Sequence, residues 1–284
     1  MRMQQQGFMA VVGTADDNRH TFPEDAHGSA TPTLMVDMVF PEQANHHGTL
    51  FGGAALSMMD KLAFLVATRA TRRPMVTACS GQIDFRSPVA QGRLVELAGE
   101  VVRRGTRSVD VEVRVIAEDL ATGERHDSLG GRFTLVAVGG ERARPNAVEL
   151  ASPGPEGIGP VSSMVEMVFP GHTNHFGTLF GGQALAWLGK AAFVAAARHA
   201  RMPVVMAASE RIDFHAPVLE GEIVDLAARV LRVGNSSMSV EVIMHAEELL
   251  TGQRRLCTRG RFTMVALGYD GRPVPVPQPA EPTC

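Results

Sequence analysis

Cysteine is scarce in this chain of 284 residues, which has three, at Cys79, Cys257 and Cys284. No CxxC spacing occurs, so a zinc site is not expected. In the internal repeat described below, the counterparts of Cys79 and Cys257 are Ala208 and Ser128. A duplicated disulfide framework would have kept its pairs, so we expect free thiols in a reducing, cytoplasmic compartment.

Long apolar runs are also absent. No uncharged apolar stretch approaches the roughly eighteen residues that a membrane span needs, and the first thirty residues are polar, without the basic start and apolar centre of a signal peptide. We therefore expect no membrane span. The formal net charge is −3 and the basic residues are scattered, which gives no case for nucleic-acid binding.

The chain contains one sequence twice. Residues 35–138 match residues 164–267 at a constant offset of 129 without a gap, and roughly half of the paired positions are identical. NHHGTLFGG at 45–53 returns as NHFGTLFGG at 174–182, and IDFRSPV at 83–89 returns as IDFHAPV at 212–218. Repeats of solenoid proteins are far shorter, so this is a duplicated domain.

The repeat divides the chain into five expected segments. These are a flexible N-terminal segment (1–32), a first domain (33–138), a linker with many glycines and prolines (139–161), a second domain (162–267) and a loose Pro-rich tail (268–284).

The pattern within one copy predicts a strand, a long helix and four further strands. Residues 54–71 lack Gly and Pro and are rich in strong helix formers, and their apolar residues cover nearly the whole circumference, which indicates a helix buried on most sides. Strands are predicted at 35–40, 76–89, 94–104, 109–117 and 132–138. The economical packing is α+β, with a curved antiparallel sheet wrapped around the helix.

These elements, with NHHGTLFGG before the helix, MMD inside it, IDFRSPV after it and RFTLVAV at the end, resemble the hotdog-fold acyl-CoA thioesterases, and most of all their tandem acyl-CoA hydrolases. The likeness covers about 210 of the 284 residues. It implies two tandem hotdog domains, hydrolysis of acyl-CoA to a free acid and coenzyme A without metal or organic cofactor, and active sites between hotdog units. It also suggests a homo-oligomer, with three tandem chains giving six units.

Asp60 is the candidate general base or nucleophile. It stands in the middle of the apolar helix, where a carboxylate is costly unless it faces a cleft or a partner, and where burial would raise its pKa toward the range useful for a general base. An ion pair with Lys61 is poor because adjacent helix residues do not share a face; an exposed edge position is the other simple alternative. The second copy has Gly189 at this position and keeps Lys190 beside it.

Asn45 and Asn174 match an asparagine that, in the resemblance, comes from the hotdog unit opposite the carboxylate and helps to hold the water or the substrate. The resemblance therefore implies that Asp60 works with Asn174. The other pairing, Asn45 with Gly189, lacks its carboxylate, so only one of the two composite sites would be competent.

Gly52 and Gly53 stand where the loop meets the helix. Bare glycines let a ligand approach the backbone closely, and free amides at a helix start suit an oxyanion. Gly53 precedes Asp60 by seven residues, so the two project within roughly 20° of one another and lie about 10 Å apart along the axis. We expect a thioester along this face to meet both, unless the glycines only form a tight turn.

Four further polar residues are candidates for contact with the substrate. His46 and His175 adjoin the asparagines and could polarise the carbonyl or contact coenzyme A, although loop-ordering histidines are the interpretation we favour. Thr77 and Ser80 lie early in the strand after the helix and could bind a water or the pantetheine arm, although satisfied strand hydroxyls are more common.

The nucleotide end of coenzyme A carries phosphates, which favour arginine and lysine. The sequence does not choose among its candidates, which are Arg103, Arg104, Arg107, Arg132, Arg232 and Arg261. No GxSxG occurs, so a serine-hydrolase elbow is not supported. Two other functions compete with hydrolysis: an acyl-CoA sensor without turnover, and a hotdog hydratase or dehydratase acting on an enoyl or 3-hydroxyacyl chain.

Overall fold

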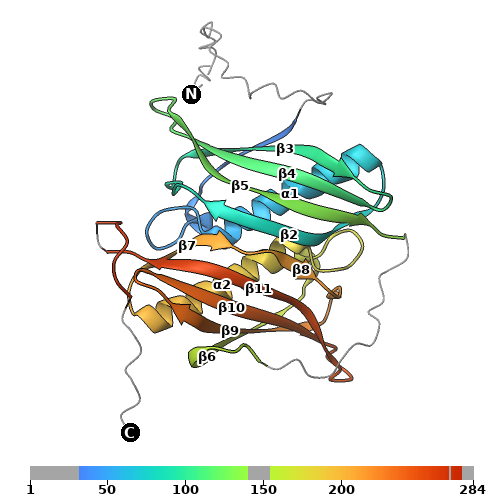
Figure 1. Ribbon diagram of the computed structural model, residues 1–284. Coiled ribbons are helices and arrows are strands. Elements are labelled where there is room, and N and C mark those ends of the chain that lie inside the picture. Colours follow the sequence, from blue (N-terminus) through green and yellow to red (C-terminus); the bar gives the residue numbers. More distant parts are fainter. Residues whose placement is uncertain (1–31, 140–153, 269, 277–284) are drawn as a thin grey trace, which may run out of the picture. The chain divides into compact units, whose positions relative to one another are not determined.

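Each repeat folds as a curved antiparallel sheet around one long helix in the computed structural model, which describes residues 32–139, 154–268 and 270–276 (Figure 1). This is the predicted α+β arrangement of two tandem hotdog domains. The predictions for residues 1–31, most of the linker (140–153), Tyr269 and the end of the tail (277–284) lie outside the described residues.

The two repeats follow the same order of elements. The first has β1 (Thr33–Met38), the 3-10 turn η1 (Pro41–Gln43), α1 (Gly52–Thr71), β2 (Met75–Phe85), β3 (Leu94–Arg104), β4 (Ser108–Glu118) and β5 (Arg125–Ala137). The second has β6 (Ile158–Met167), η2 (Pro170–His172), α2 (Gly181–Ala200), β7 (Val204–Ser209), β8 (Ile212–Phe214), β9 (Ile223–Val233), β10 (Ser237–Glu247) and β11 (Arg254–Ala266). Because β7 and β8 are separate, the second repeat breaks the strand that is continuous in β2.

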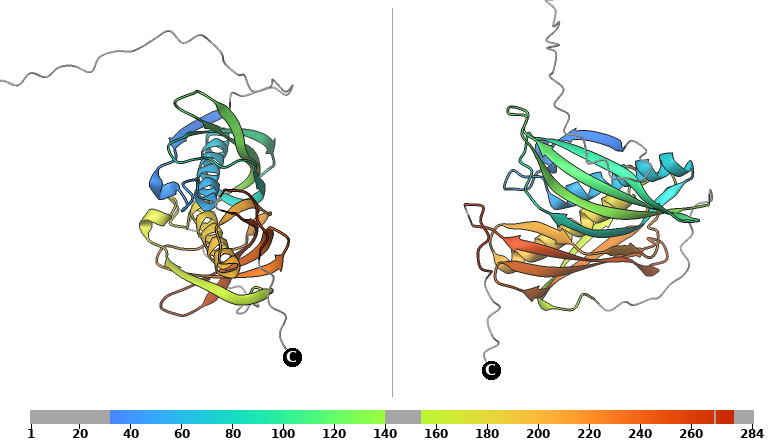
Figure 2. Two further views of the ribbon diagram at one scale, coloured as in Figure 1. Left: turned by 90° about the vertical axis from the view of Figure 1, so that its left-hand side faces the viewer. Right: turned by 45° about the horizontal axis from the view of Figure 1, so that its top comes forward.

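The two sheets join into one sheet. Among the described residues the strand order is β1-β3-β4-β5-β2-β7-β11-β10-β9-β6, with β8 bridging β2 and β11. The join is antiparallel: Ile83 of β2 faces Ser209 of β7, and Cys79 of β2 faces Asp213 of β8. Both helices lie on the same side of the joined sheet and contact one another there (Figure 2). Each helix start is thereby placed against the other repeat.

The helices are buried on most sides, as their composition predicts. In α1 the fully buried side chains include Leu56, Met59 and Leu62, whereas Lys61 is exposed. The C-cap of α1, Arg72, adopts the left-handed conformation, and Pro74 prevents the helix from continuing. Neither α1 nor α2, the long helices of the described chain, is apolar enough to cross a membrane.

Several boundaries differ from the expectations. β5 begins at Arg125, seven residues before the predicted start at 132. β2 ends at Phe85 rather than at Val89, before the proline at 88. β6 begins at Ile158, inside the segment assigned to the linker, because a bulge lets it extend along β9. The start of the tail is not loose: Val276 is buried and donates its backbone N–H to Asn235 O at 2.7 Å.

Candidate active site

Asp60 is fully buried on α1, and its side chain is anchored by the strand that follows the helix. Thr77 of β2 donates its hydroxyl to Asp60 Oδ1 at 2.7 Å. Asp60 is not at an exposed edge of the helix, and it forms no ion pair with Lys61. Both simple alternatives to a functional role are therefore wrong for this residue. Thr77 is thus the residue that fixes the orientation of the carboxylate.

The environment makes the carboxyl group a weaker acid than usual. Burial raises the pKa of Asp60 to about 6, against the smaller lowering effects of the Thr77 hydroxyl and the Gly182 backbone amide, both of which favour the charged form. A carboxyl group with this pKa is largely ionised at neutral pH and remains able to accept a proton.

The second carboxylate oxygen faces the other repeat. A Cβ atom on Gly181 would lie 3.1 Å from Asp60 Oδ2, and one on Gly182 would lie 2.9 Å from Ser57 O, so the start of α2 approaches α1 only because both residues are glycine. The Gly182 amide comes near the carboxylate, but Oδ2 has no hydrogen-bond partner among the described residues. A buried carboxylate oxygen is therefore free beside a helix N-terminus.

A cavity of about 220 Å³ lies next to this point, although Asp60 itself does not line it. Thr77 and Gly181, the two residues that touch Asp60, both line it, together with Asn174. Its lining is mostly apolar and comes from both repeats: Phe64, Met75, Val76, Ala78, Val136 and Val138 from the first, and Phe176, Leu179, Phe180, Ala184, Phe214, Ala216, Val218, Met244 and Cys257 from the second. Its shape suits an apolar chain attached to a polar group at the Thr77 end.

Asn174 holds the loop before α2 in shape. Its side-chain amide donates to Thr178 Oγ1 at 2.9 Å, and its oxygen accepts the backbone N–H of Phe176 at 2.9 Å. Asn45 makes the equivalent bonds in the first repeat, to Thr49 Oγ1 and from the backbone N–H of His47. Each amide has a second N–H, but it is Asn174 that lines the cavity beside Thr77.

The two histidines pack on aromatic rings across the join. The ring of His175 lies 5.9 Å from that of Phe64 on α1, and the ring of His46 lies 5.7 Å from that of Phe193 on α2. Neither histidine lines the cavity. These contacts fit the loop-ordering interpretation.

Gly52 and Gly53 do not lie at Asp60, which corrects the expectation that one face of α1 presents them together. A Cβ on Gly53 would lie 2.8 Å from Ala186 O, and one on Gly52 would lie 2.9 Å from Met206 Sδ, both in the second repeat. Helix spacing within α1 was the wrong guide, because the helices cross and each glycine pair meets the opposite helix. The glycines at Asp60 are Gly181 and Gly182.

The second composite site has lost its polar pair. The counterparts of Asp60 and Thr77 are Gly189 and Met206. Met206 is buried and its Cε lies 3.0 Å from where a Cβ of Gly189 would stand. Methionine therefore fills the volume that a carboxylate would occupy.

The walls of the two sites differ as well. Three cavity residues have polar counterparts in the first repeat: Phe176, Ala216 and Cys257 correspond to His47, Ser87 and Ser128. Ser87 donates to Asp127 O at 3.1 Å, and its hydroxyl lies 3.5 Å from that of Ser128. The apolar wall is thus specific to the repeat that faces Asp60.

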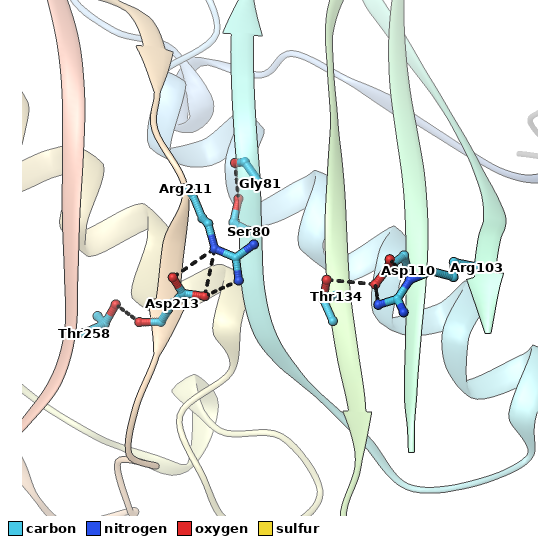
Figure 3. A network of polar contacts seen from close by, with 8 residues as sticks. All are labelled: Ser80, Gly81, Arg103, Asp110, Thr134, Arg211, Asp213 and Thr258. Carbon is cyan, nitrogen blue, oxygen red and sulfur yellow. Dashed lines mark hydrogen bonds and ion pairs between the residues drawn. The ribbon is translucent and has the colours of Figure 1, made fainter. Parts of the chain in front are cut away.

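Ser80 is not part of this cavity. It is fully buried, donates to the neighbouring Gly81 O at 3.3 Å, and lies beside a polar network along the join (Figure 3). In that network Arg211 binds Asp213 at 2.7 Å, and Thr258 donates to the Asp213 backbone carbonyl at 2.8 Å. The network braces the strands, and we assign Ser80 a structural role.

The cysteines at the join and in the cavity are free and buried. Burial is the largest cause that raises the thiol pKa to about 11 for both Cys79 and Cys257. Neither is a thiolate near neutral pH, so nucleophilic chemistry does not run through them.

Relatives of this chain are named as thioester hydrolases. A cytosolic acyl coenzyme A thioester hydrolase of Rattus norvegicus is 24% identical over 86% of this chain and 76% of its own length. An uncharacterised acyl-CoA thioester hydrolase of Bacillus subtilis is 42% identical over 39% of this chain and 64% of its own length. A solved acyl-CoA hydrolase from Agrobacterium tumefaciens is 45% identical and covers 86% of this chain and 98% of its own, with a TM-score of 0.40.

The family model described as the thioesterase superfamily matches twice, at residues 47–124 and 176–253, once in each repeat. Together the two matches span more than half of the 284 residues. The chain therefore belongs to the thioesterase superfamily.

Proposed function

We propose that this protein hydrolyses acyl-CoA thioesters to a free acid and coenzyme A, at one composite site per chain and without metal or organic cofactor. The observation that carries the proposal is the oxygen of a buried carboxylate, Asp60 Oδ2, which has no hydrogen-bond partner among the described residues. It lies beside the glycine start of α2, next to Thr77 and Gly181, which line an apolar cavity. The acyl chain occupies the cavity, and the thioester carbonyl lies where Thr77, Gly181 and Asn174 line it, next to Asp60.

The chemistry needs an activated oxygen nucleophile and a site for negative charge. Asp60 accepts a proton from water as the water oxygen bonds to the carbonyl carbon, or its carboxylate attacks that carbon directly and water then hydrolyses the anhydride. In either route the backbone N–H at the start of α2, where Gly181 lines the cavity, stabilises the oxyanion. The C–S bond breaks, coenzyme A leaves as a thiolate and is protonated.

Asn174 orients the water or the carbonyl from the second repeat. It lines the cavity together with Thr77, and one of its amide hydrogens is not needed for the bond to Thr178. The site thus takes its base from one repeat and its polar loop from the other. Gly189 and Met206 leave the second composite site without a base.

Release of free thiol from a panel of acyl-CoAs tests this function. Wild-type protein releases thiol, and Asp60→Asn, which keeps the size of the side chain, lowers the rate by orders of magnitude. Lys61→Gln, an exposed change on the same turn, is the matched control and leaves the rate unchanged. Absence of thiol release from every acyl-CoA would instead favour the sensor, or the hydratase, which alters the acyl chain and keeps the thioester.

We further propose a cytosolic location, in line with the names of the mammalian relatives, and a trimer of tandem chains. Support for self-association comes from the two edge strands, β1 and β6, and the residues that directly follow them, which expose equivalent apolar side chains. Val36 and Phe40 are 58% and 48% exposed, and their counterparts Val165 and Phe169 are 65% and 56% exposed. Light scattering of wild type and of Val36→Lys with Val165→Lys tests this: a monomeric wild type would contradict it.

A further inference from the structure

A buried ion pair lies behind one wall of the cavity, in the second repeat. Arg255 of β11 binds the carboxylate of Glu222 through both ends of its guanidinium group, from Nη1 to Oε1 at 2.8 Å and from Nη2 to Oε2. Both side chains are only 8% exposed. Removing two charges from water is costly, and apolar residues in their place are often as stable or more so. Stability alone therefore gives no reason for this pair.

The two partners of the pair also hold the backbone of the loop between β8 and β9. Arg255 donates to the carbonyl oxygen of Pro217 from Nη2 at 2.7 Å and from Nε at 3.3 Å. Glu222 Oε2 accepts the backbone N–H of Leu219 at 2.7 Å. One ion pair thus fixes this loop at two points, one on each side of Val218.

The fixed loop is a wall of the cavity. Each of the residues 214–218, which we call the wall segment, lines the cavity. At the end of the wall segment, Val218 O accepts the backbone N–H of Leu179 at 2.8 Å. Leu179 also lines the cavity, two residues before Gly181 at the start of α2. A displacement of the wall segment would therefore change the space for an acyl chain.

The first repeat does not have the same pair at the equivalent positions. Arg93 stands at the position of Glu222, so the sign of the charge is reversed, and His126 stands at the position of Arg255. Arg93 pairs instead with Asp119 at 2.9 Å, where the two side chains are 28% and 26% exposed. The counterpart of the wall segment, residues 85–89, does not line the cavity. The buried pair thus belongs to the repeat whose loop forms the wall.

We propose that Arg255 is a positioning residue which, through Glu222 and the Pro217 carbonyl, determines the acyl chains that the cavity accepts. This proposal rests on the hydrolase function proposed above. A guanidinium group is planar and donates in several fixed directions, whereas the ammonium of lysine is a point charge on a flexible stem. Arginine can therefore hold a carboxylate and a carbonyl at once. The acyl chain then meets a wall of fixed shape, against which a difference of one or two methylenes is felt.

The central test removes both charges together, as Arg255→Met/Glu222→Leu, because loss of one partner would leave an uncompensated buried charge. The constants kcat and KM are measured for acyl-CoAs of increasing chain length. For the acyl-CoA that the wild type prefers, KM should rise, and the preference over a chain two methylenes shorter should fall roughly tenfold. For the shortest acyl-CoA that is turned over, kcat should stay within about twofold, because Asp60 is untouched.

Two further variants separate positioning from support of the fold. Arg255→Lys keeps the charge without the planar fork and should lose part of the same preference. Arg93→Leu/His126→Met makes the matched change in the first repeat and should leave the acyl preference unaltered. An unchanged preference in a folded Arg255→Met/Glu222→Leu protein, or an equal change in the first-repeat control, overturns the proposal. A uniform fall in kcat/KM at every chain length also overturns it, because the pair would then only support the fold.

Binding of S-alkyl coenzyme A thioethers, which cannot be hydrolysed at a carbonyl, adds a measurement that does not depend on turnover. In calorimetry the wild type should bind more tightly with each added methylene, and this gain should be smaller in Arg255→Met/Glu222→Leu. A wild type that shows the gain but releases no thiol from acyl-CoAs would contradict the hydrolase function and leave the positioning role intact. Equal gains in the wild type and the double variant would contradict the positioning role alone.

Discussion

Met206 Cε lies 3.0 Å from the point where residue 189 would carry a Cβ atom, so the second repeat has methionine where the first has a hydrogen-bonded carboxylate. In the first repeat the corresponding pair, Thr77 and Asp60, is joined at 2.7 Å. Removing one partner of a buried pair leaves the other unsatisfied, whereas replacing both by apolar packing is nearly neutral. The two substitutions are therefore energetically coupled.

This coupling predicts that Gly189→Asp alone destabilises the protein by about 3 kcal/mol or more, because the carboxylate is buried against Met206. Adding Met206→Thr should recover part of the loss, with a coupling energy of about 1–3 kcal/mol. Denaturant unfolding of the wild type, both single variants and the double variant measures this energy. If the changes in the free energy of unfolding are additive, residues 189 and 206 do not interact and the coupling is wrong.

The rate of thioester hydrolysis should depend on the ionisation of Asp60. Burial raises the pKa of Asp60 to about 6, and the base must be deprotonated, so kcat/KM should rise with pH through about 6 and then level. Asp60→Asn should lower turnover roughly 10²- to 10⁴-fold and abolish this acid limb. A profile for the wild type that is flat from pH 5 to 8 would remove Asp60 from the mechanism.

The same shift predicts how Asp60→Asn affects stability. The pKa of Asp60 is higher in the folded protein, at about 6, than its ordinary 3.8, so the folded state binds the proton more tightly and ionisation destabilises it as the pH rises from 4 to above 6. Asp60→Asn should therefore stabilise the protein at pH 8, by up to about 3 kcal/mol. The gain should disappear near pH 4. Urea unfolding at pH 5 and pH 8 checks the sign, and a larger gain at pH 5 would contradict it.

Asn174→Ala and Asn45→Ala form a matched pair, because both asparagines make the same loop bonds. Loss of these bonds should lower stability by a similar amount in the two variants, about 1 kcal/mol. Only Asn174 lines the cavity beside Thr77, so Asn174→Ala should lose at least tenfold more activity than Asn45→Ala. Initial rates, normalised to the folded fraction, decide this; equal losses would mean that both composite sites work.

The apolar wall in the second repeat should set the preferred acyl length. Met244 lines the cavity, and its counterpart in the first repeat is Val115. Met244→Ala should move the preference toward longer chains, and Cys257→Leu should move it toward shorter ones. Val115→Ala is the control, since it also removes buried methyl groups but lies outside the cavity. It should lower the free energy of unfolding by a few kcal/mol at most. A shift of equal size in Val115→Ala would place the acyl chain elsewhere.

Much of this fold is predictable from the sequence because the patterns are local. The helix predicted at 54–71, which begins at 52 in the structure, the strand at 94–104 and the duplication follow from propensity, period and identity between the copies. The strand ends at 85 and 158 are not predictable in this way, because pairing with β5 and β9 decides them. The packing of Val276 on the turn at 235 joins segments that no period connects.

The sequence was enough to single out Asp60 as the candidate base, but not to predict the residues that Asp60 contacts. An aspartate in an apolar helix stands out from composition alone, and Gly189 shows the asymmetry. The pairing of Asp60 with Thr77 depends on how β2 returns along α1, and its contact with Gly181 depends on how two helices cross. The role of Gly52 and Gly53 was misplaced for that reason. In the second repeat, Met206 at the position of Thr77 is the one signal that could have revealed the pair.

The antiparallel join between β2 and the strands β7 and β8 holds the two repeats together within one chain. Each repeat is nevertheless encoded by its own stretch of the gene. In a dimer of two identical chains, any substitution appears in both halves, so a change that removes one acidic group removes both. Fusion lifts that restriction. The two repeats of this protein can therefore diverge in sequence. The second repeat, which has Gly189 in place of an aspartate, can specialise in binding the acyl chain.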